Sequence, residues 1–263
     1  MASGILSEKR GHTKGYKEIL LDSRNRTSGT TSSFTTTLPA SFDIRDIVVV
    51  EAEIPFTWYI VNSTNNKIDI KEPSGGTTAV ATISSGTYTS STLTAELKTR
   101  LEAAGAAATI YTISFSTTTG KYTIAGDTTF DLLFSTGANA STSIREVLGF
   151  NATDKTGASS YVSDNVANLT GEQYIYIKSS LVRGITEGVV SAGFATDTGI
   201  LAKIPVSGVF GDTLFYKPPV ERSILAYVGT KITSIDLSLT FRSNVSIDLN
   251  GQPWAIKLGA YLA

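Results

Sequence analysis

Two glutamates are the side chains whose type and spacing first suggest chemistry in this sequence. Glu51 and Glu53 lie two residues apart in the segment IVVVEAEIPFTWY, residues 47–59, so in a β-strand they share one face. Paired carboxylates can act as general acid and general base in an enzyme. No neighbour with catalytic potential accompanies them, so a solvated or intersubunit face is the favoured interpretation. We therefore expect no enzymatic activity and identify no catalytic residue.

Composition narrows the remaining chemistry. The 263 residues include no cysteine and a single histidine, His12, which lies in a polar amino-terminal stretch. Without cysteine there are no disulfides and no thiolate metal sites. One histidine leaves almost no room for a Ser–His–Asp triad or a His-rich zinc site. We expect neither a metal nor a cofactor.

An aromatic group follows the two glutamates. Pro55 cannot donate to a sheet ladder and predicts a strand end or an edge, and Phe56, Trp58 and Tyr59 come directly after it. Such a group can anchor an interface between subunits, or it can close one end of a β-sandwich as part of the core. The core interpretation is favoured, and both stay open at this point.

The segment that carries these residues has the period of a strand with one buried face. Val48, Val50, Ala52 and Ile54 alternate along it, which predicts that these four side chains face the core. The opposite side begins with the apolar Ile47 and Val49, which we expect to be covered. It ends with the two glutamates, which we expect to face solvent. We expect a strand over residues 47–55.

Charge and hydropathy give only broad limits on function. The formal net charge is −1, and charged residues make up 17% of the chain. Such a balance provides no overall field that would attract nucleic acid. The first residues, MASGILSEKRGHTKGYK, lack the apolar centre of a secretory signal, and no apolar run reaches the length of a spanning helix. We expect a soluble intracellular product without specific nucleic-acid binding.

Residues 1–28 read as a mildly basic amino-terminal arm. Glycines interrupt any helical period there, and the bland interpretation is a disordered tail. The functional interpretation is an arm that becomes ordered on neighbouring subunits or near nucleic acid. Its candidate contacts are the basic residues Lys9, Arg10, Lys14, Lys17, Arg24 and Arg26.

Most of the remaining chain has β patterns. Outside one excursion the alternation predicts eight short strands separated by Pro and Gly turns, a number typical of a single jelly-roll sandwich. In that topology the two longest strands, 47–55 and 231–241, are expected to be neighbours in one sheet. The eight expected strands are 33–38, 47–55, 67–71, 173–179, 200–206, 213–217, 231–241 and 253–262.

Residues 73–155 differ from the rest and predict an inserted α+β domain. The spacing of Leu93, Leu97 and Leu101 predicts a helix from about 91 to 104, with Ser91 or Thr92 as its N-cap. A hairpin over 110–125 follows the helix. The expected fold is thus mainly β: a jelly-roll domain of residues 29–72 and 156–263, interrupted by an insertion domain of residues 73–155.

A series of motifs in a fixed order carries a resemblance to a known family. The motifs are LLDSRNR (20–26), SSFTTTLP (32–39), VVVEAEIPFTWYIVNSTNN (48–66), SGTYTSSTLTAEL (85–97), YTISFSTTTGKYTI (111–124), VLGF (147–150), ILAKIPV (200–206) and the closing ITSIDLSLTF and DLNGQPWAIKL. Through them the chain resembles the penton, or vertex, capsid proteins of virophages and of large icosahedral double-stranded DNA viruses, which are of the single jelly-roll type. The resemblance spans nearly the whole chain and is weakest over residues 160–199.

The resemblance implies a structural virion protein. It implies a homopentamer at each fivefold vertex, bordered by trimers of a major capsid protein, with the chain made in the cytoplasm of the infected cell. The amino-terminal arm would lie at the inner face, where minor capsid proteins are further partners. The insertion would project outward, where it could touch a host surface. The alternative function from the residues is a receptor- or glycan-binding β-sandwich module of a viral spike or fibre.

Overall fold

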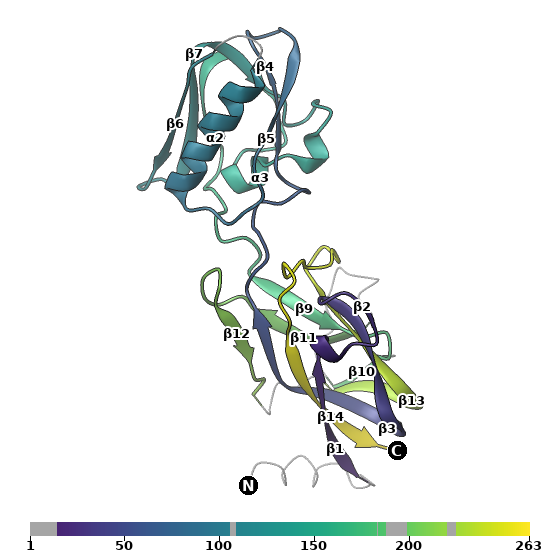
Figure 1. Cartoon of the computed structure of the whole chain (residues 1–263). Helices are drawn as coiled ribbons and strands as arrows, with labels where there is room; N and C mark the ends of the chain where they lie inside the picture. The colour runs from purple at the N-terminus through teal and green to yellow at the C-terminus, as the bar shows by residue number, and fades with distance from the viewer. Residues whose placement is uncertain (1–14, 106–108, 183, 188–198, 220–224) are drawn as a thin grey trace. The chain divides into compact units, whose positions relative to one another are not determined.

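The computed structural model describes residues 15–105, 109–182, 184–187, 199–219 and 225–263. The chain divides into two compact units (Figure 1). The first unit combines residues 1–58 with 172–263, and the second unit is residues 59–171. The expected His12, Lys9, Arg10 and Lys14 lie outside the described residues.

The first unit is built on one antiparallel sheet that contains nine strands among the described residues. The strand order along the sheet is β1-β14-β3-β13-β9-β11, with β2 and β12 pairing with β3 and β10 pairing with β13. Its elements are β1 (Tyr16–Asp22), η1 (Ser23–Asn25), β2 (Ser28–Gly29), β3 (Ser33–Pro55), β9 (Tyr174–Lys178), β10 (Gly184–Glu187), β11 (Ile200–Pro205), β12 (Thr213–Tyr216), β13 (Leu225–Thr240) and β14 (Ala255–Leu262).

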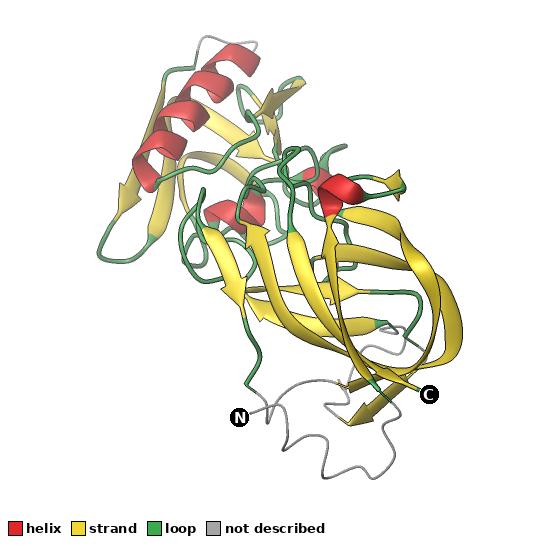
Figure 2. Ribbon diagram, turned by 60° about the horizontal axis from the view of Figure 1, so that its bottom comes forward, coloured by secondary structure: helices red, strands yellow, loops and turns green. Residues whose placement is uncertain are grey.

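The sheet of the first unit curls around its own core. Figure 2 shows its strands bending over one another, as expected for a jelly-roll-like sandwich. The interior is filled by apolar side chains from every layer of the curl, including Ile44, Ile54, Ile235 and Leu258, each fully buried. The mainly β fold class is therefore confirmed, whereas the expected count of eight strands is not.

Strand β3 continues past Leu38, where the sequence predicted a break. Residues 33–38 and 47–55 are parts of one strand of 23 residues, not two strands joined by a turn. The pairing with β13 passes directly from Ile232↔Phe42 to Ser234↔Thr37, so the residues around Pro39 bulge out of the ladder. A proline at a bulge needs no ladder hydrogen bond, and the strand can continue past it.

The pairing of β3 with β13 also differs from the expected pairing of segments 47–55 and 231–241. Residues 231–238 pair with Ser33–Asp43, in the first half of β3. The half that carries the two glutamates pairs with β14 and β12 instead. Strands β3 and β13 are thus neighbours, but segments 47–55 and 231–241 do not form the expected ladder.

A second bulge changes which valines face the core. The register between β3 and β14 passes from Glu51↔Lys257 to Val49↔Leu258, which leaves Val50 without an opposite residue. Val49 therefore belongs to the core cluster, and the expected core residue Val50 is only half-buried. Val48 lies with Gly259 on the outer face, where it is covered but outside that cluster. The alternation holds only for Ala52 and Ile54, because an extra residue inverts the faces on one side of a bulge.

The second unit has its own five-stranded sheet and its own core. Its strand order is β5-β4-β7-β6, with β8 pairing with β7. Leu93, Leu97 and Leu101 of helix α2 are fully buried in this core, as the spacing predicts. The elements are β4 (Lys67–Lys71), β5 (Thr78–Thr82), α2 (Ser90–Ala104), β6 (Tyr111–Ser116), β7 (Lys121–Leu132), η2 (Ala140–Thr142), α3 (Arg145–Leu148) and β8 (Lys155–Val162).

The boundaries of the second unit differ from the expected insertion 73–155. Strand β4, expected in the sandwich, pairs with β5 and β7, and β8 pairs with β7. Both strands therefore belong to the second sheet, and the expectation that 67–71 joins 173–179 in one sandwich was wrong. The alternation of Ile68 and Ile70 reports a buried face but not which sheet buries it.

The amino-terminal arm is also shorter than the expected residues 1–28. Residues 16–22 form β1, which pairs with β14 from Tyr16↔Tyr261 to Asp22↔Ala255. Leu21 on this strand is 2% exposed and belongs to the core of the first unit. Burial of such a side chain contributes about 1.5–3 kcal/mol, which explains why this stretch is part of the sheet.

Candidate assembly surface

The outer face of β1, β14, β3 and β12 brings together residues from both ends of the chain. Lys257 of β14 lies opposite Leu20 on one side and opposite Glu51 on the other. Two residues further along β3, Glu53 lies opposite Phe215 of β12. Directly opposed residues in an antiparallel pair project from the same face. We define the outer-sheet patch as Tyr16, Leu20, Glu51, Glu53, Phe215 and Lys257.

An ion pair lies in the middle of this patch. The Glu51 Oε1 and Lys257 Nζ atoms are 2.5 Å apart, and each side chain keeps 30% of its exposure. The hydrogen bond from Lys257, together with its charge and that of Lys217, holds the pKa of Glu51 below its ordinary value. The same hydrogen bond raises the pKa of Lys257. Both groups are therefore charged at neutral pH, and the Glu51 carboxylate is already an acceptor for its neighbour.

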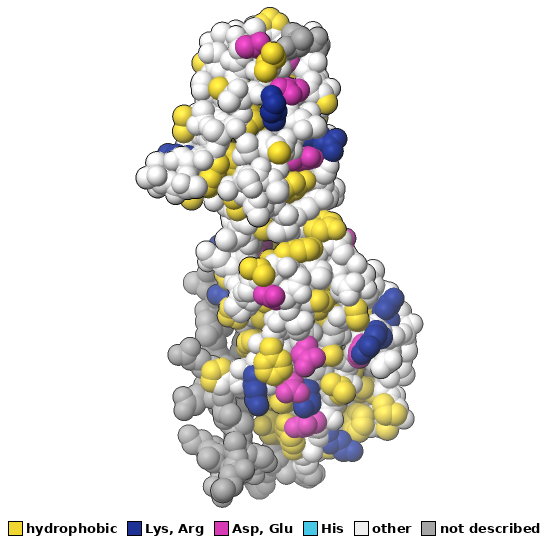
Figure 3. Space-filling view, turned by 60° about the vertical axis from the view of Figure 1, so that its left-hand side comes forward, with side chains coloured by type: hydrophobic (Ala, Val, Ile, Leu, Met, Phe, Trp, Pro, Cys, Tyr) yellow, Lys and Arg dark blue, Asp and Glu magenta, His cyan; other side chains and the backbone are white. Residues whose placement is uncertain are grey.

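Large apolar side chains surround the ion pair and remain in water. Leu20 is 70% exposed, Phe215 is 62% exposed and Tyr16 is 47% exposed. Tyr16 lies across Gly259, where a Cβ atom would come within 2.6 Å of its hydroxyl oxygen. Figure 3 shows acidic, basic and apolar side chains intermixed on a face of the first unit. Exposed apolar side chains grouped with charged ones are typical of a surface that a partner covers.

The expected aromatic anchors do not take part in this patch. Phe56 and Trp58 are each 4% exposed and belong to the core of the first unit. Their ring centroids are 4.4 Å apart, and Trp58 also meets Phe241 edge to face at 6.2 Å. This placement agrees with the core interpretation of the two residues. Tyr59 is half-buried and belongs to the second unit.

The described basic residues of the expected arm are engaged within the first unit. The Lys17 ammonium lies 5.0 Å from the centre of the Phe42 ring. Arg24 pairs with Asp22 at 2.5 Å, and the Arg26 Nη1 donates to the Ser23 carbonyl at 2.8 Å. The two arginine contacts lie in the turn between β1 and β2, and Lys17 packs on β3, so all three residues have partners within this unit.

Sequence reasoning identified Glu51 and Glu53 but missed the rest of the patch. Leu20 and Lys257 are far apart in the chain and become neighbours only through the β1–β14 pairing. The one available signal was the short apolar run Ile19–Leu21, which does not alternate and so does not show which of its side chains faces outward. Phe215 lies in a four-residue strand, too short for its exposed face to be recognised from alternation.

Two further features of the described residues bear on possible sites. No group of three or more His, Asp or Glu side chains within them is arranged to hold a metal ion. No helix in the same residues is long and apolar enough to cross a membrane.

Comparison with known proteins places this chain beside two viral structures. No protein-family model matches the chain, and no curated protein sequence matches it significantly. A chain in the cryo-EM structure of the Sputnik virophage is 14% identical, with a TM-score of 0.42 over 94% of this chain and 97% of that one. The crystal structure of the mavirus penton protein is 11% identical, with a TM-score of 0.48 over 95% of this chain and all of that one. Across nearly its whole length, the chain is thus similar to a penton protein of one virophage and to a chain from the particle of another.

Proposed function

We propose that this chain is a structural capsid protein that forms homopentamers at the fivefold vertices of an icosahedral virion. The observation that carries the proposal is the outer-sheet patch, where Leu20 and Phe215 are exposed beside the Glu51–Lys257 pair. The open face of an antiparallel sheet is ordinarily polar. Apolar side chains of this size on such a face support a contact within an assembly. The resemblance of the ordered sequence motifs to those of penton proteins supports a vertex as that assembly.

A ring of five copies requires a heterologous interface, in which the patch of one copy meets a different surface of the next. The curled sheet of the first unit provides a rigid body for such a contact. Leu20 and Phe215 would supply the apolar area, and the charges of Glu51, Glu53 and Lys257 would select the orientation. The buried Phe56 and Trp58 have no part in this proposal.

The remaining partners are proposed on the resemblance. Trimers of a major capsid protein would border each pentamer, and the virion would be the location of the protein after synthesis in the cytoplasm of the infected cell. Contact with minor capsid proteins would fall to residues 1–14, because Lys17, Arg24 and Arg26 already serve the first unit. The second unit is proposed to face outward.

Native mass spectrometry and light scattering of the full chain test this proposal. The wild type is expected to form pentamers, and the L20D/F215D variant is expected to remain monomeric, since charge on these exposed positions opposes burial between copies. V209D is the matched control, because Val209 is 69% exposed and lies outside the patch. It should assemble as the wild type does.

An oligomer with a copy number other than five would contradict the proposal. A trimer that binds sugars would favour a spike or fibre module, and pentamers of L20D/F215D would remove the patch from the interface. If the isolated wild type is monomeric, the same three proteins are compared for incorporation at the vertices of particles formed with the major capsid protein. Equal incorporation of L20D/F215D and wild type would then argue against the patch.

A further inference from the structure

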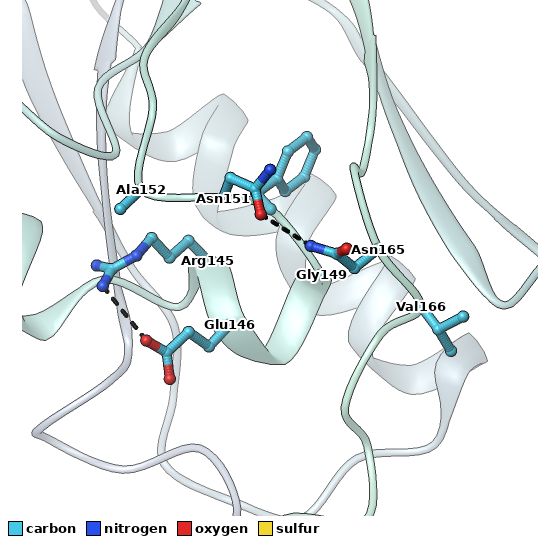
Figure 4. Close-up of a pocket in the computed structure, with 8 residues that line it drawn as sticks. Arg145, Glu146, Gly149, Asn151, Ala152, Asn165 and Val166 are labelled. Atoms are coloured by element: carbon cyan, nitrogen blue, oxygen red, sulfur yellow. Dashed lines mark hydrogen bonds and ion pairs between the residues drawn. The ribbon is translucent and has the colours of Figure 1, made fainter.

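The second unit contains a small open pocket beside helix α3. Its volume is about 270 Å³. It is lined by residues of two segments, 145–152 and 165–166 (Figure 4). This size is near the lower end of the range of small-ligand sites, about 300–1,000 Å³. It suits one compact ring.

The walls of the pocket are held in place before any ligand binds. Gly149 ends helix α3 with φ 84°, and its N–H donates to the carbonyls of Arg145 and Glu146. The Asn165 N–H then donates to the Gly149 carbonyl at 2.8 Å. A Cβ atom on Gly149 would come within 2.3 Å of the Asn165 carbonyl oxygen, so only glycine allows the two segments this close. The pocket is therefore preorganised.

Two polar pairs face one another across the pocket. On one side the Asn165 Nδ2 donates to the Asn151 Oδ1 at 2.9 Å. On the other side the Arg145 Nη2 lies 3.3 Å from the Glu146 Oε1, and the Glu146 side chain is 82% exposed (Figure 4). Each side-chain amide thus uses one of its two polar atoms in this hydrogen bond. Among the described residues, no group bonds to the Asn151 Nδ2 or the Asn165 Oδ1, which remain as one donor and one acceptor.

The charges and the apolar wall limit the kind of ligand. The Arg145 guanidinium is beside the Glu146 carboxylate, so the pair brings no net charge and gives no net attraction for a phosphate or another anion. Val166 is 64% exposed and adds an apolar surface at the edge of the pocket. A ligand that matches this set has several groups that both donate and accept hydrogen bonds, a C–H face and no charge.

We propose that this pocket binds one neutral hexopyranose unit of a glycan. Each sugar hydroxyl donates and accepts, so adjacent hydroxyls can accept from the Asn151 Nδ2 and donate to the Asn165 Oδ1 and the Glu146 carboxylate. The C–H face of the ring would pack on Val166. The proposal concerns the second unit alone and stands whether or not the chain forms pentamers.

Saturation-transfer difference NMR on the full chain tests the site. The probes are the methyl pyranosides of mannose, galactose, glucose and N-acetylglucosamine, at concentrations suited to an affinity of about 1 mM. At least one of them should receive saturation. The variants N151D and E146Q keep the shape of each side chain, and the new carboxylate of N151D still accepts from Asn165. Both should bind that probe about tenfold more weakly or worse, because N151D replaces the donor with a second acceptor and E146Q replaces a charged acceptor with a neutral amide.

The control variant is N168D, since the Asn168 Oδ1 accepts from Thr170 and Gly171 outside the pocket and the change keeps that acceptor. It should bind as the wild type does. Amide spectra of all variants should overlay the wild type away from the changed residue. The proposal is overturned if no pyranoside receives saturation, if N151D and E146Q bind as the wild type does, or if inorganic phosphate displaces the sugar.

Discussion

Glu51 and Lys257 face each other across the β3–β14 ladder, with the carboxylate and the ammonium 2.5 Å apart. The residues are more than 200 positions apart in the sequence, so the pair reports the closure of the sheet of the first unit. It lies directly beside the exposed Leu20 on β1. The bulge at Val50 is what places Glu51, rather than Val50, opposite Lys257.

This ion pair is expected to contribute little to the stability of one copy. Both side chains are partly in water, where screening and the cost of ordering two long side chains offset the attraction. The variants E51Q and K257M, alone and together, should keep the wild-type midpoint in urea. Tryptophan fluorescence is a suitable probe, because both tryptophans, Trp58 and Trp254, are buried in the first unit. A clear loss in either single variant that the double variant restores would show that the pair stabilises the monomer.

Three aspartates of the second unit have a pKa below the ordinary value. Burial would raise the pKa of Asp131, but hydrogen bonds from the Ser74 hydroxyl and the backbone N–H groups of Gly75 and Gly157 outweigh it. Asp154 is similar. The pKa of Asp164 is lowered most by the hydrogen bond from the Asn151 N–H and next by the hydrogen bond from the Lys155 ammonium.

Acid should therefore destabilise the second unit. A carboxylate whose pKa is lowered by folding stabilises the folded state fully above its unfolded pKa of about 3.9, and this stabilisation is lost as the pH falls through the folded value. Amide hydrogen exchange followed by mass spectrometry should show peptides of residues 59–171 losing protection as the pH drops below about 4. Protection that is unchanged down to about pH 2 would contradict this assignment.

The variant D131N separates the role of Asp131 from a general effect of acid. Asparagine cannot accept all three hydrogen bonds, so the second unit should lose about 1–3 kcal/mol at neutral pH. Its remaining acid dependence should be shallower than that of the wild type, since one titrating group is gone. D127N is the control, because the Asp127 Oδ1 accepts one bond, from the exposed Ile110 N–H, and asparagine keeps that acceptor.

Local patterns in the sequence predicted single elements well. Strands β9, β11, β12 and β14 lie within two residues of the expected positions, because alternation and flanking Gly or Pro mark each one separately. The helix of the second unit also matches its leucine spacing. These elements need only information that is adjacent in the chain.

Pairing between distant segments could not be predicted in the same way. Strand β4 alternates as a sandwich strand would, yet its partners are β5 and β7. The expected strand 231–241 is part of a longer strand, β13, which begins at Leu225 and whose register with β3 shifts near Gly229 at φ 59°. Bulges of this kind depend on the opposite strand. The outer-sheet patch was missed for the same reason, since Leu20, Glu51 and Phe215 meet only after the sheet has formed.

The start of helix α2 shows how local competition shifts a cap. Sequence reasoning chose Ser91 or Thr92, but Thr89 is the N-cap: its Oγ1 accepts from the Thr92 N–H at 3.2 Å, and its own N–H donates to the Thr92 Oγ1 at 2.9 Å. This capping box satisfies the backbone N–H groups of Thr89 and Thr92 reciprocally. A run of Thr and Ser residues contains several suitable caps, and the reciprocal bond selects one.

Replacement of this cap should weaken the second unit and leave the first unit unchanged. T89A leaves the Thr92 N–H without its acceptor, and loss of an N-cap costs about 0.5–2 kcal/mol. Amide exchange should quicken around Leu93 and Leu97, whose burial depends on the first turns of α2, while the urea midpoint seen by tryptophan fluorescence stays constant. The control is T99A on the same helix, where the hydroxyl bonds only to the Ala95 carbonyl at 3.0 Å and alanine favours the helix. Equal losses of protection in T89A and T99A would show that Thr89 does not act as the cap.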